Sequence, residues 1–286
     1  MRFFVLLFIL SIQSFASTEI KTRIIDVDYG AKSDDEILVF LESGLVTKLD
    51  QTMEKKFYNI LKREKSYLKK QKYKIIIDNQ RFIKSIEELD QKLLIPSFDT
   101  FLRQDKNNLY VPTTIESMEV AKKYFREARR TSKPETQCFN RAMVWSYEWW
   151  LKHSLKSNKL LVFFSRTFIR RFNFEWWFHI APSIHVMEGD KVVEKVMDVK
   201  YSSGPISFQR WTDIFTRGKK YVCPIITKYS EYADYPYTGE CYLYRTSMYT
   251  YQPADLQMLE AWNYQKDNFL YEEVKGAYLE AFDIQL

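Results

Sequence analysis

Glycine is scarce in this chain, and so are the motifs that depend on it. The 286 residues include 7 glycines, where about 20 would be usual at roughly 7% of a chain. No GxGxxG and no GxxxxGK[ST] pattern occurs. The common glycine-rich phosphate-binding loops are therefore excluded.

Metal-binding residues and excess charge are also limited. The chain has three cysteines and three histidines, too few for a protein with several zinc sites. Its formal net charge is +6, which is too weakly basic to argue for a nucleic-acid partner. We therefore expect no nucleic acid among its partners.

Long apolar runs are absent after the first residues. Phe3 to Ile12 is a nearly unbroken apolar run behind Arg2, too short to span a bilayer. Small residues at Ser14 and Ala16 then fit a cleavage site, so residues 1–16 are predicted to be a signal peptide. The alternative is an N-terminal membrane anchor. The mature protein is expected to be secreted or periplasmic, without a membrane partner.

Hydrophobic residues make up 46% of the chain and aromatic residues 17%, enough for a sizeable core.

Two blocks follow the signal peptide: an N-terminal domain or pro-region, 17–107, and a second domain, 108–286. In the first block, short strands over 21–28, 36–41 and 74–77 and a helix over 54–70 indicate an α/β-type segment, and a polar stretch over 99–112 is expected to be a linker.

The second block has the pattern of an α+β domain. The predicted helices cover 117–130, a segment beginning near Thr136 as N-cap, 205–215, and most of 254–282. The predicted strands cover 159–165, 175–187 and 191–198, with a turn at Glu188-Gly189-Asp190 between the last two. This pattern predicts a helix packed on an antiparallel sheet.

Secretion affects how the three cysteines are interpreted, because thiols tend to pair in an oxidising compartment. Cys223 and Cys241 lie in one tyrosine-rich stretch, whereas Cys138 stands apart. A Cys223–Cys241 disulfide would leave Cys138 free. The alternative is three buried, reduced cysteines.

Cys138, His179 and Asp198 are the candidate catalytic residues. Cys138 lies at a predicted helix start, where unpaired N–H groups and the helix dipole favour a nucleophilic thiolate. His179, on the next long strand, is suited to act as general base and acid. Asp198 ends the adjacent strand, so the hairpin can bring its carboxylate to the imidazole. The order Cys, His, Asp is that of papain-like and transglutaminase-like thiol enzymes.

Three short sequence segments resemble the motifs of one family. Cys138-Phe139-Asn140-Arg141-Ala142 resembles the Cys-x-x-Arg-Ala motif of the protein-glutaminase family, which consists of secreted bacterial protein-deamidating enzymes. Trp176 to Ala181 is similar to the family's histidine strand. Val193 to Asp198, with Ser202-Ser203-Gly204-Pro205 and Trp211, resembles its aspartate hairpin. Val199 follows Asp198 where the family commonly has proline.

This resemblance implies that Cys138, His179 and Asp198 form a catalytic triad, and that an N-terminal pro-region covers the active site until it is removed. We therefore expect an α+β fold with a papain- or transglutaminase-like core. The expected activity is deamidation of glutamine side chains in proteins through a thioester, with ammonia released and no metal or organic cofactor needed. Trp176 and Trp177 are expected to line the substrate site.

The expected partners are proteins or peptides with exposed glutamine, and the chain is expected to be a monomer. Two alternatives stay open. One is a transglutaminase or cysteine peptidase with the same triad. The other is a non-catalytic binding protein on that scaffold.

Overall fold

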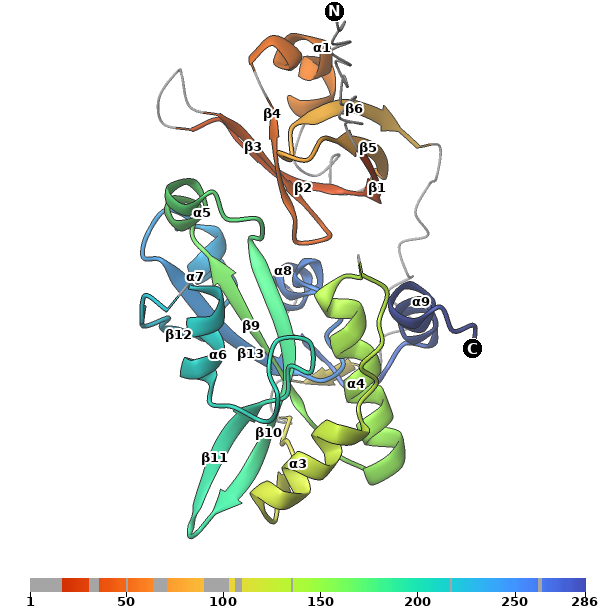
Figure 1. Cartoon of the computed structure of the whole chain (residues 1–286), viewed down its shortest axis with the longest axis vertical. Helices are drawn as coiled ribbons and strands as arrows, with labels where there is room; N and C mark the ends of the chain where they lie inside the picture. Colours follow the sequence, from red (N-terminus) through yellow and green to blue (C-terminus); the bar gives the residue numbers. More distant parts are fainter. Residues whose placement is uncertain are drawn as a thin grey trace, which may run out of the picture. The chain divides into compact units, whose positions relative to one another are not determined.

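A computed structural model describes most of the chain, which divides into two compact units (Figure 1). One unit comprises Met1–Glu42 and Val46–Leu93, and the other comprises Ser43–Leu45 and Leu94–Leu286. The expected signal peptide lies outside the described residues. The described residues are 17–30, 36–49, 51–63, 71–89, 103–105, 110–134, 136–216, 218–261 and 264–286.

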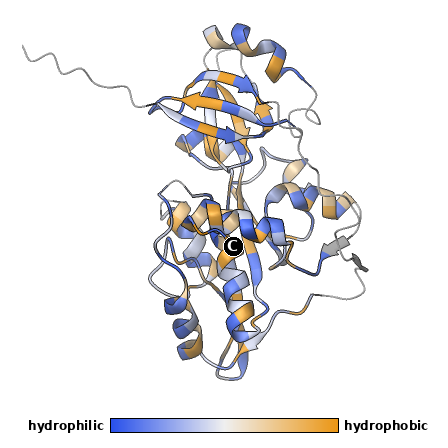
Figure 2. Ribbon diagram, turned by 90° about the vertical axis from the view of Figure 1, so that its right-hand side faces the viewer, coloured by the Kyte–Doolittle hydropathy of each residue, from blue (hydrophilic) through white to orange (hydrophobic). Residues whose placement is uncertain are grey.

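The first unit consists of two three-stranded antiparallel sheets, in the orders β1-β5-β6 and β2-β3-β4, and the helix α1. Buried and half-buried residues alternate along β5, as expected for a strand with one face on a core. Figure 2 shows hydrophobic and hydrophilic residues interspersed along the strands of the unit. The antiparallel pairing makes the unit α+β, which corrects the α/β-type segment expected from the sequence. Its elements are β1 (Thr18–Thr22), β2 (Ile24–Asp28), β3 (Ile37–Leu41), β4 (Val46–Leu49), α1 (Gln51–Leu61), β5 (Tyr73–Ile77) and β6 (Ile83–Glu88).

The second unit is built around a six-stranded sheet of order β11-β10-β9-β13-β12, with β8 also paired to β10. The four long strands run antiparallel to their neighbours, whereas the short strands β8 and β12 pair in parallel. All seven residues of β9 are buried, because it lies between β10 and β13. The strands are β8 (Thr114–Ile115), β9 (Asn158–Phe164), β10 (Phe178–Glu188), β11 (Lys191–Val196), β12 (Ile225–Ile226) and β13 (Cys241–Ser247).

The helix α4 (Cys138–His153) lies alongside β10 (Figure 1) and also packs against α9. Eight consecutive residues, 139–146, are buried, so this helix is enclosed on more than one face. Trp145 and Trp149 pack in a core with α3 and β10, and Met143 and Val144 pack against α9. The other helices of this unit are α3 (Met118–Glu127), α5 (Arg166–Phe172), α6 (Phe208–Phe215), α7 (Ser230–Ala233), α8 (Pro253–Ala261) and α9 (Tyr271–Phe282).

The C-terminal tail is less uniformly helical than its sequence suggests. A short strand, β14 (Tyr264–Lys266), separates α8 from α9 and pairs with β7 (Arg103–Asp105). The stretch expected to be a polar linker therefore contributes a strand to this unit. Within the part of the chain that the structure describes, no helix combines the length and hydrophobicity needed to cross a bilayer.

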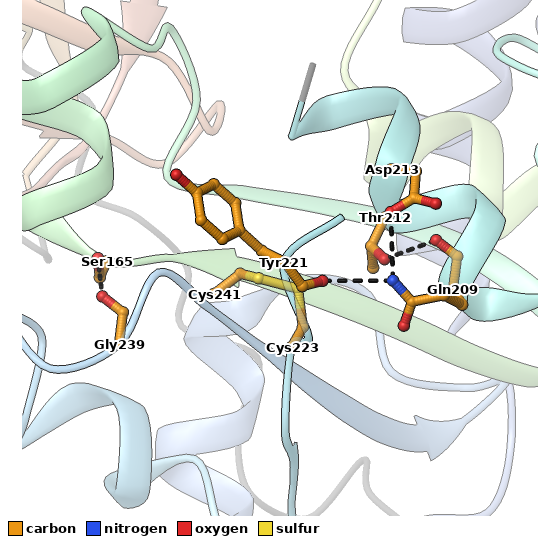
Figure 3. The surroundings of a disulfide bond; sticks show 8 residues. All are labelled: Ser165, Gln209, Thr212, Asp213, Tyr221, Cys223, Gly239 and Cys241. Carbon is orange, nitrogen blue, oxygen red and sulfur yellow. Dashed lines mark hydrogen bonds between the residues drawn. A yellow bond between two sulfur atoms is a disulfide. The ribbon is translucent and has the colours of Figure 1, made fainter. Parts of the chain in front are cut away.

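The predicted disulfide between Cys223 and Cys241 is confirmed (Figure 3). It joins the loop before β12 to the first residue of β13. The same loop is held to α6, because the Gln209 side chain donates to the Tyr221 carbonyl oxygen at 3.3 Å. Cys138 is the free cysteine and is half-buried.

Candidate functional site

Cys138 is the first residue of α4, whose N-cap is Gln137. Thr136 is therefore not the N-cap that the sequence suggested. The Gln137 side chain makes no capping hydrogen bond, so it does not occupy the N–H groups of the first helical turn. These groups and the helix dipole create a positive potential beside the Cys138 sulfur.

His179 and Asp198 lie in contact at the end of the β10–β11 hairpin. The antiparallel pairing extends to Ser183 opposite Val196, and the Met197 N–H still donates to the Pro182 carbonyl oxygen. The chain thus carries Asp198 along β10 towards His179. The His179 Nε2 and Asp198 Oδ2 atoms are 2.7 Å apart, and both side chains are almost fully buried.

The Asp198 carboxylate is held by further donors. The Trp211 indole N–H donates to Oδ2 at 2.9 Å, and the Lys200 backbone N–H approaches Oδ1 at 3.3 Å. The Ser202 N–H and hydroxyl both donate to the Asp198 carbonyl oxygen. These contacts fix the carboxylate and its turn, so that Oδ2 accepts from the imidazole and the indole together.

Cys138 also acts on the imidazole, because its side chain helps to raise the pKa of His179. Because Nε2 contacts Asp198, the ring nitrogen left for the sulfur is Nδ1. Burial by itself would lower the pKa of His179, but the charge and hydrogen bond of Asp198, together with those of Cys138, raise it to about 9. The imidazole is therefore positively charged at neutral pH.

A buried arginine adds positive charge to this site. Burial would raise the pKa of Asp198, but the His179 charge and hydrogen bond, the Trp211 hydrogen bond and the Arg141 charge lower it. Arg141, one turn after Cys138, is 4% exposed, and one guanidinium nitrogen donates to the Thr136 carbonyl oxygen. Among the described residues, its Nε atom has no hydrogen-bond partner.

Aromatic rings surround the imidazole. Trp176 stacks over His179 with ring centroids 5.9 Å apart, Tyr201 meets it edge-on at 5.1 Å, and Phe215 lies at 4.5 Å. Trp176 is half-exposed, whereas Trp177 is 4% exposed and packs against Phe163 and Phe178. Trp176 is thus placed at the site surface and Trp177 in the core behind it.

No group of three His, Cys, Asp or Glu residues in the described ranges is arranged to hold a metal ion. His185 lies on β10 opposite Glu194, six residues from His179, and His153 bonds to Glu127 near the end of α4. The three histidines are therefore in separate surroundings.

Two residues of this site were not singled out in the sequence. Tyr201 and Phe215 contact the imidazole, but no spacing in the sequence marks them, because each reaches His179 from a different turn or helix. Trp211 and Arg141 lie within the quoted motifs. Their contacts with Asp198 and Thr136 follow only from the fold.

The same region matches a known family. Residues 114–215 match the model of a glutaminase family. This range contains Cys138, His179 and Asp198. The resemblance to the protein-glutaminase family is confirmed. No curated protein matches the chain.

Solved protein-glutaminase structures share the fold. A crystal structure of pro-protein-glutaminase is 12% identical, with a TM-score of 0.53, and each chain covers 90% of the other. A crystal structure of its A47Q2 mutant is 14% identical, with the same score and coverage. At these identities the likeness concerns the α+β fold alone.

Proposed function

We propose that this chain is a protein-glutamine deamidase that uses Cys138 as its nucleophile. One observation carries the proposal: His179 and Asp198 are hydrogen-bonded, and Cys138 raises the pKa of the same imidazole, within a segment that matches a glutaminase family model. The sulfur lies at a helix start, beside the positive end of the helix dipole, and the thiolate is the nucleophilic form of cysteine.

In the proposed reaction, the Cys138 thiolate attacks the carboxamide carbon of a glutamine side chain. The new S–C bond moves the carbonyl electron pair onto the oxygen. His179 then donates its proton to the nitrogen as the C–N bond breaks, so that ammonia leaves and a thioester remains. Water gives a proton to His179 and attacks the thioester, which releases glutamate and regenerates the thiolate.

The negative oxygen of the intermediate needs donors. The uncapped N–H groups at the start of α4 supply them, because Gln137 makes no side-chain capping bond. Asp198 acts as the partner that holds the His179 ring and balances its charge. The mechanism requires no metal or organic cofactor.

Substrates in this proposal are proteins or peptides with an exposed glutamine. Trp176 is the candidate for substrate contact, because it is half-exposed and stacked over His179. Trp177 lies behind Trp176 in the core and supports its position. A core of the papain or transglutaminase type agrees with a cysteine helix packed on an antiparallel sheet.

We further propose secretion or a periplasmic location for the mature chain as a monomer, with residues 1–16 as signal peptide. The Cys223–Cys241 disulfide supports an oxidising compartment. The division of the chain into an N-terminal domain or pro-region, 17–107, and a second domain, 108–286, remains a prediction, and so does the removal of the first part.

The decisive test measures ammonia release from a glutamine-containing protein by the wild type and by Cys138→Ala. We expect release by the wild type and none by the variant, because no thioester can form. His179→Ala is expected to be nearly inactive, whereas its control His185→Ala, on the same strand, should retain activity. Substrate cross-linking or chain cleavage in place of ammonia release would contradict deamidation, and an active Cys138→Ala would contradict the thiol mechanism.

A further inference from the structure

Tyr201 belongs to the turn that presents Asp198. Its backbone N–H donates to the Asp198 carbonyl oxygen at 3.2 Å. Its ring lies edge-on to His179, with an interplanar angle of 89°, and packs against Phe215 and Trp176. The position of this half-buried ring beside the imidazole is therefore fixed from several sides.

The Tyr201 hydroxyl differs from those tyrosine hydroxyls of this unit that are hydrogen-bonded within the protein. Tyr251 donates to Asn140, and Tyr278 donates to Glu148. For Tyr201, the described part of the chain provides no hydrogen-bond partner. A polar group of this kind on a ring that packs against the His179 imidazole is available to a ligand, because a half-buried hydroxyl favours a partner.

Burial, together with nearby negative charges, keeps the phenol protonated. Burial raises the pKa of Tyr201 above its ordinary value; the Arg141 charge opposes this shift, and the charges of Asp198, Cys138 and Glu175 add to it. At neutral pH the group is therefore a neutral O–H donor. Two of the groups whose charges act on the phenol, Cys138 and Arg141, belong to the first turn of α4.

We propose that Tyr201 is a further catalytic residue, whose hydroxyl donates a hydrogen bond to the side-chain carbonyl oxygen of the glutamine substrate. This inference rests on the proposed deamidase function. The Tyr201 hydroxyl would be a side-chain donor to the substrate carbonyl oxygen. The backbone N–H groups at the start of α4 would bind the same oxygen from another direction.

The hydroxyl acts without transferring its proton. As the Cys138 sulfur bonds to the carboxamide carbon, the carbonyl electron pair moves to the oxygen, which becomes a stronger acceptor. When the intermediate collapses, the C=O bond reforms and the C–N bond breaks, with the proton for ammonia coming from His179. Because the bond strengthens as the oxygen becomes charged, its loss should lower kcat more than it raises KM.

The test compares the full chain as wild type, Tyr201→Phe and Tyr235→Phe, before and after limited proteolysis. Tyr201→Phe keeps the ring on His179 and removes only the hydroxyl. The control, Tyr235→Phe, removes a hydroxyl from a side chain that is 64% exposed. The measurements are kcat and KM for ammonia release, and the rate at which iodoacetamide alkylates Cys138. The other two cysteines are in the disulfide, so alkylation reports on Cys138.

We expect Tyr201→Phe to lose about tenfold to a hundredfold in kcat, with the alkylation rate and Tyr235→Phe close to wild type. A loss smaller than about tenfold overturns the inference, and so does an equal loss in alkylation rate, because the hydroxyl would then act on the thiol. A wild type that releases no ammonia contradicts the proposed function itself. An active wild type with an equally active Tyr201→Phe contradicts the inference alone.

Discussion

His179 and Asp198 form an ion pair that is almost shielded from solvent, with side-chain exposures of 3% and 1%. Solvent screens charges only weakly at a buried site, so the Asp198 carboxylate strongly raises the pKa of the imidazole. The pKa of His179, about 9, results from this neighbour acting against burial. The state of this single pair should therefore set the pH range of activity.

The first residue-scale prediction concerns pH. Because His179 must carry the proton for ammonia, wild-type kcat should fall as the pH rises through about 9. Asp198→Asn supplies a neutral partner, so the alkaline limb should move to lower pH and kcat should drop roughly 10²- to 10⁴-fold. The measurement is kcat for ammonia release from pH 5 to 10, with folding checked by circular dichroism.

Asp213→Asn is the matched control for this substitution. Asp213 accepts from Gln209 at 3.2 Å within α6, so its neutralisation should leave the pH profile of kcat unchanged. A wild-type profile in Asp198→Asn would mean that another group holds His179. In that case a shifted profile in Asp213→Asn would identify that group.

The sequence was sufficient to select Cys138, His179 and Asp198 as candidates, because a helix start and a hairpin make their approach foreseeable. The structure places His179 and Asp198 in contact, and Cys138 acts on the same imidazole. It could not be foreseen that Tyr201 and Phe215 would pack on the imidazole, since these contacts depend on how a turn and α6 fold back onto β10. No periodic pattern in a sequence predicts which way a side chain points in a tertiary contact.

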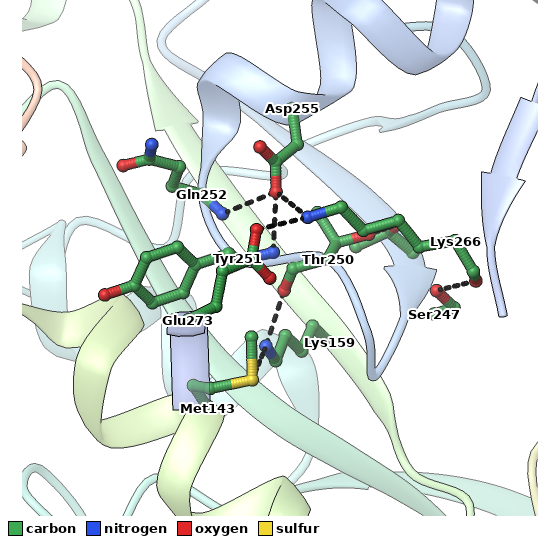
Figure 4. Close-up of polar contacts among 10 residues, drawn as sticks. Met143, Lys159, Ser247, Thr250, Tyr251, Gln252, Asp255, Lys266 and Glu273 are labelled. Carbon is green, nitrogen blue, oxygen red and sulfur yellow. Dashed lines mark hydrogen bonds and ion pairs between the residues drawn. The ribbon is translucent and has the colours of Figure 1, made fainter. Parts of the chain in front are cut away.

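At the level of elements, β9 contains a buried lysine at the point where the sheet meets α4. The Lys159 amine donates to the Thr250 carbonyl oxygen and lies 3.7 Å from the Met143 sulfur (Figure 4). Nearby, Lys266 forms ion pairs with Asp255 and Glu273. This cluster links α4, β9, α8, β14 and α9.

The charge of Lys159 has a clear consequence for stability. Burial lowers its pKa to about 7, with Glu273 and Asp255 opposing that shift and Lys266 adding to it. Because the folded-state pKa lies below the ordinary value of 10.5, this group's contribution is fully present above that value and is lost as the pH falls through about 7.

Lys159→Met should remove this dependence. We expect the free energy of unfolding of the wild type to fall between pH 9 and pH 7 more steeply than that of the variant, by up to about 1.4 kcal/mol per pH unit. Urea unfolding at pH 7, 8 and 9 measures both slopes. The control is Lys191→Met at an exposed position of β11, which should keep the wild-type slope. Parallel slopes for Lys159→Met and wild type would contradict the prediction.

Most elements of the second unit were predictable because their periodicity is strong. The hairpin of β10 and β11 was placed correctly, and its turn at Gly189 has the positive φ of 61° that favours glycine. The strand β14 was missed, because three residues between two helices have no pattern of their own. Its pairing with β7 joins segments far apart in the sequence, which local patterns do not record.

At the scale of the whole chain, the N-terminal unit raises the question of activation. The motifs around Cys138 resemble those of the protein-glutaminase family, and from this resemblance we propose that the segment before residue 108 covers the active site until it is removed. Its folded sheets and helix make it a domain of its own.

Removal of this segment should raise the rate of ammonia release. Limited trypsin digestion, with N-terminal sequencing to locate the cut, tests this on the full chain. Cleavage is expected in the basic, polar stretch Arg103–Asn108, preferably beyond the strand β7. The same digestion of Cys138→Ala should yield no activity. Unchanged activity after complete removal would leave the segment as an ordinary domain.

The burial of α4 also limits which substitutions this helix can accept as the sequence changes during evolution. Residues 139–146 are all buried between a sheet and neighbouring helices, so a substitution at any of them changes packing that several elements share. Neutral drift in this helix is therefore confined to its outer positions, such as Trp150 and Leu151, which are 37% and 57% exposed. In distant descendants of this chain, the stretch behind the nucleophile should change slowly and the far end of the helix quickly.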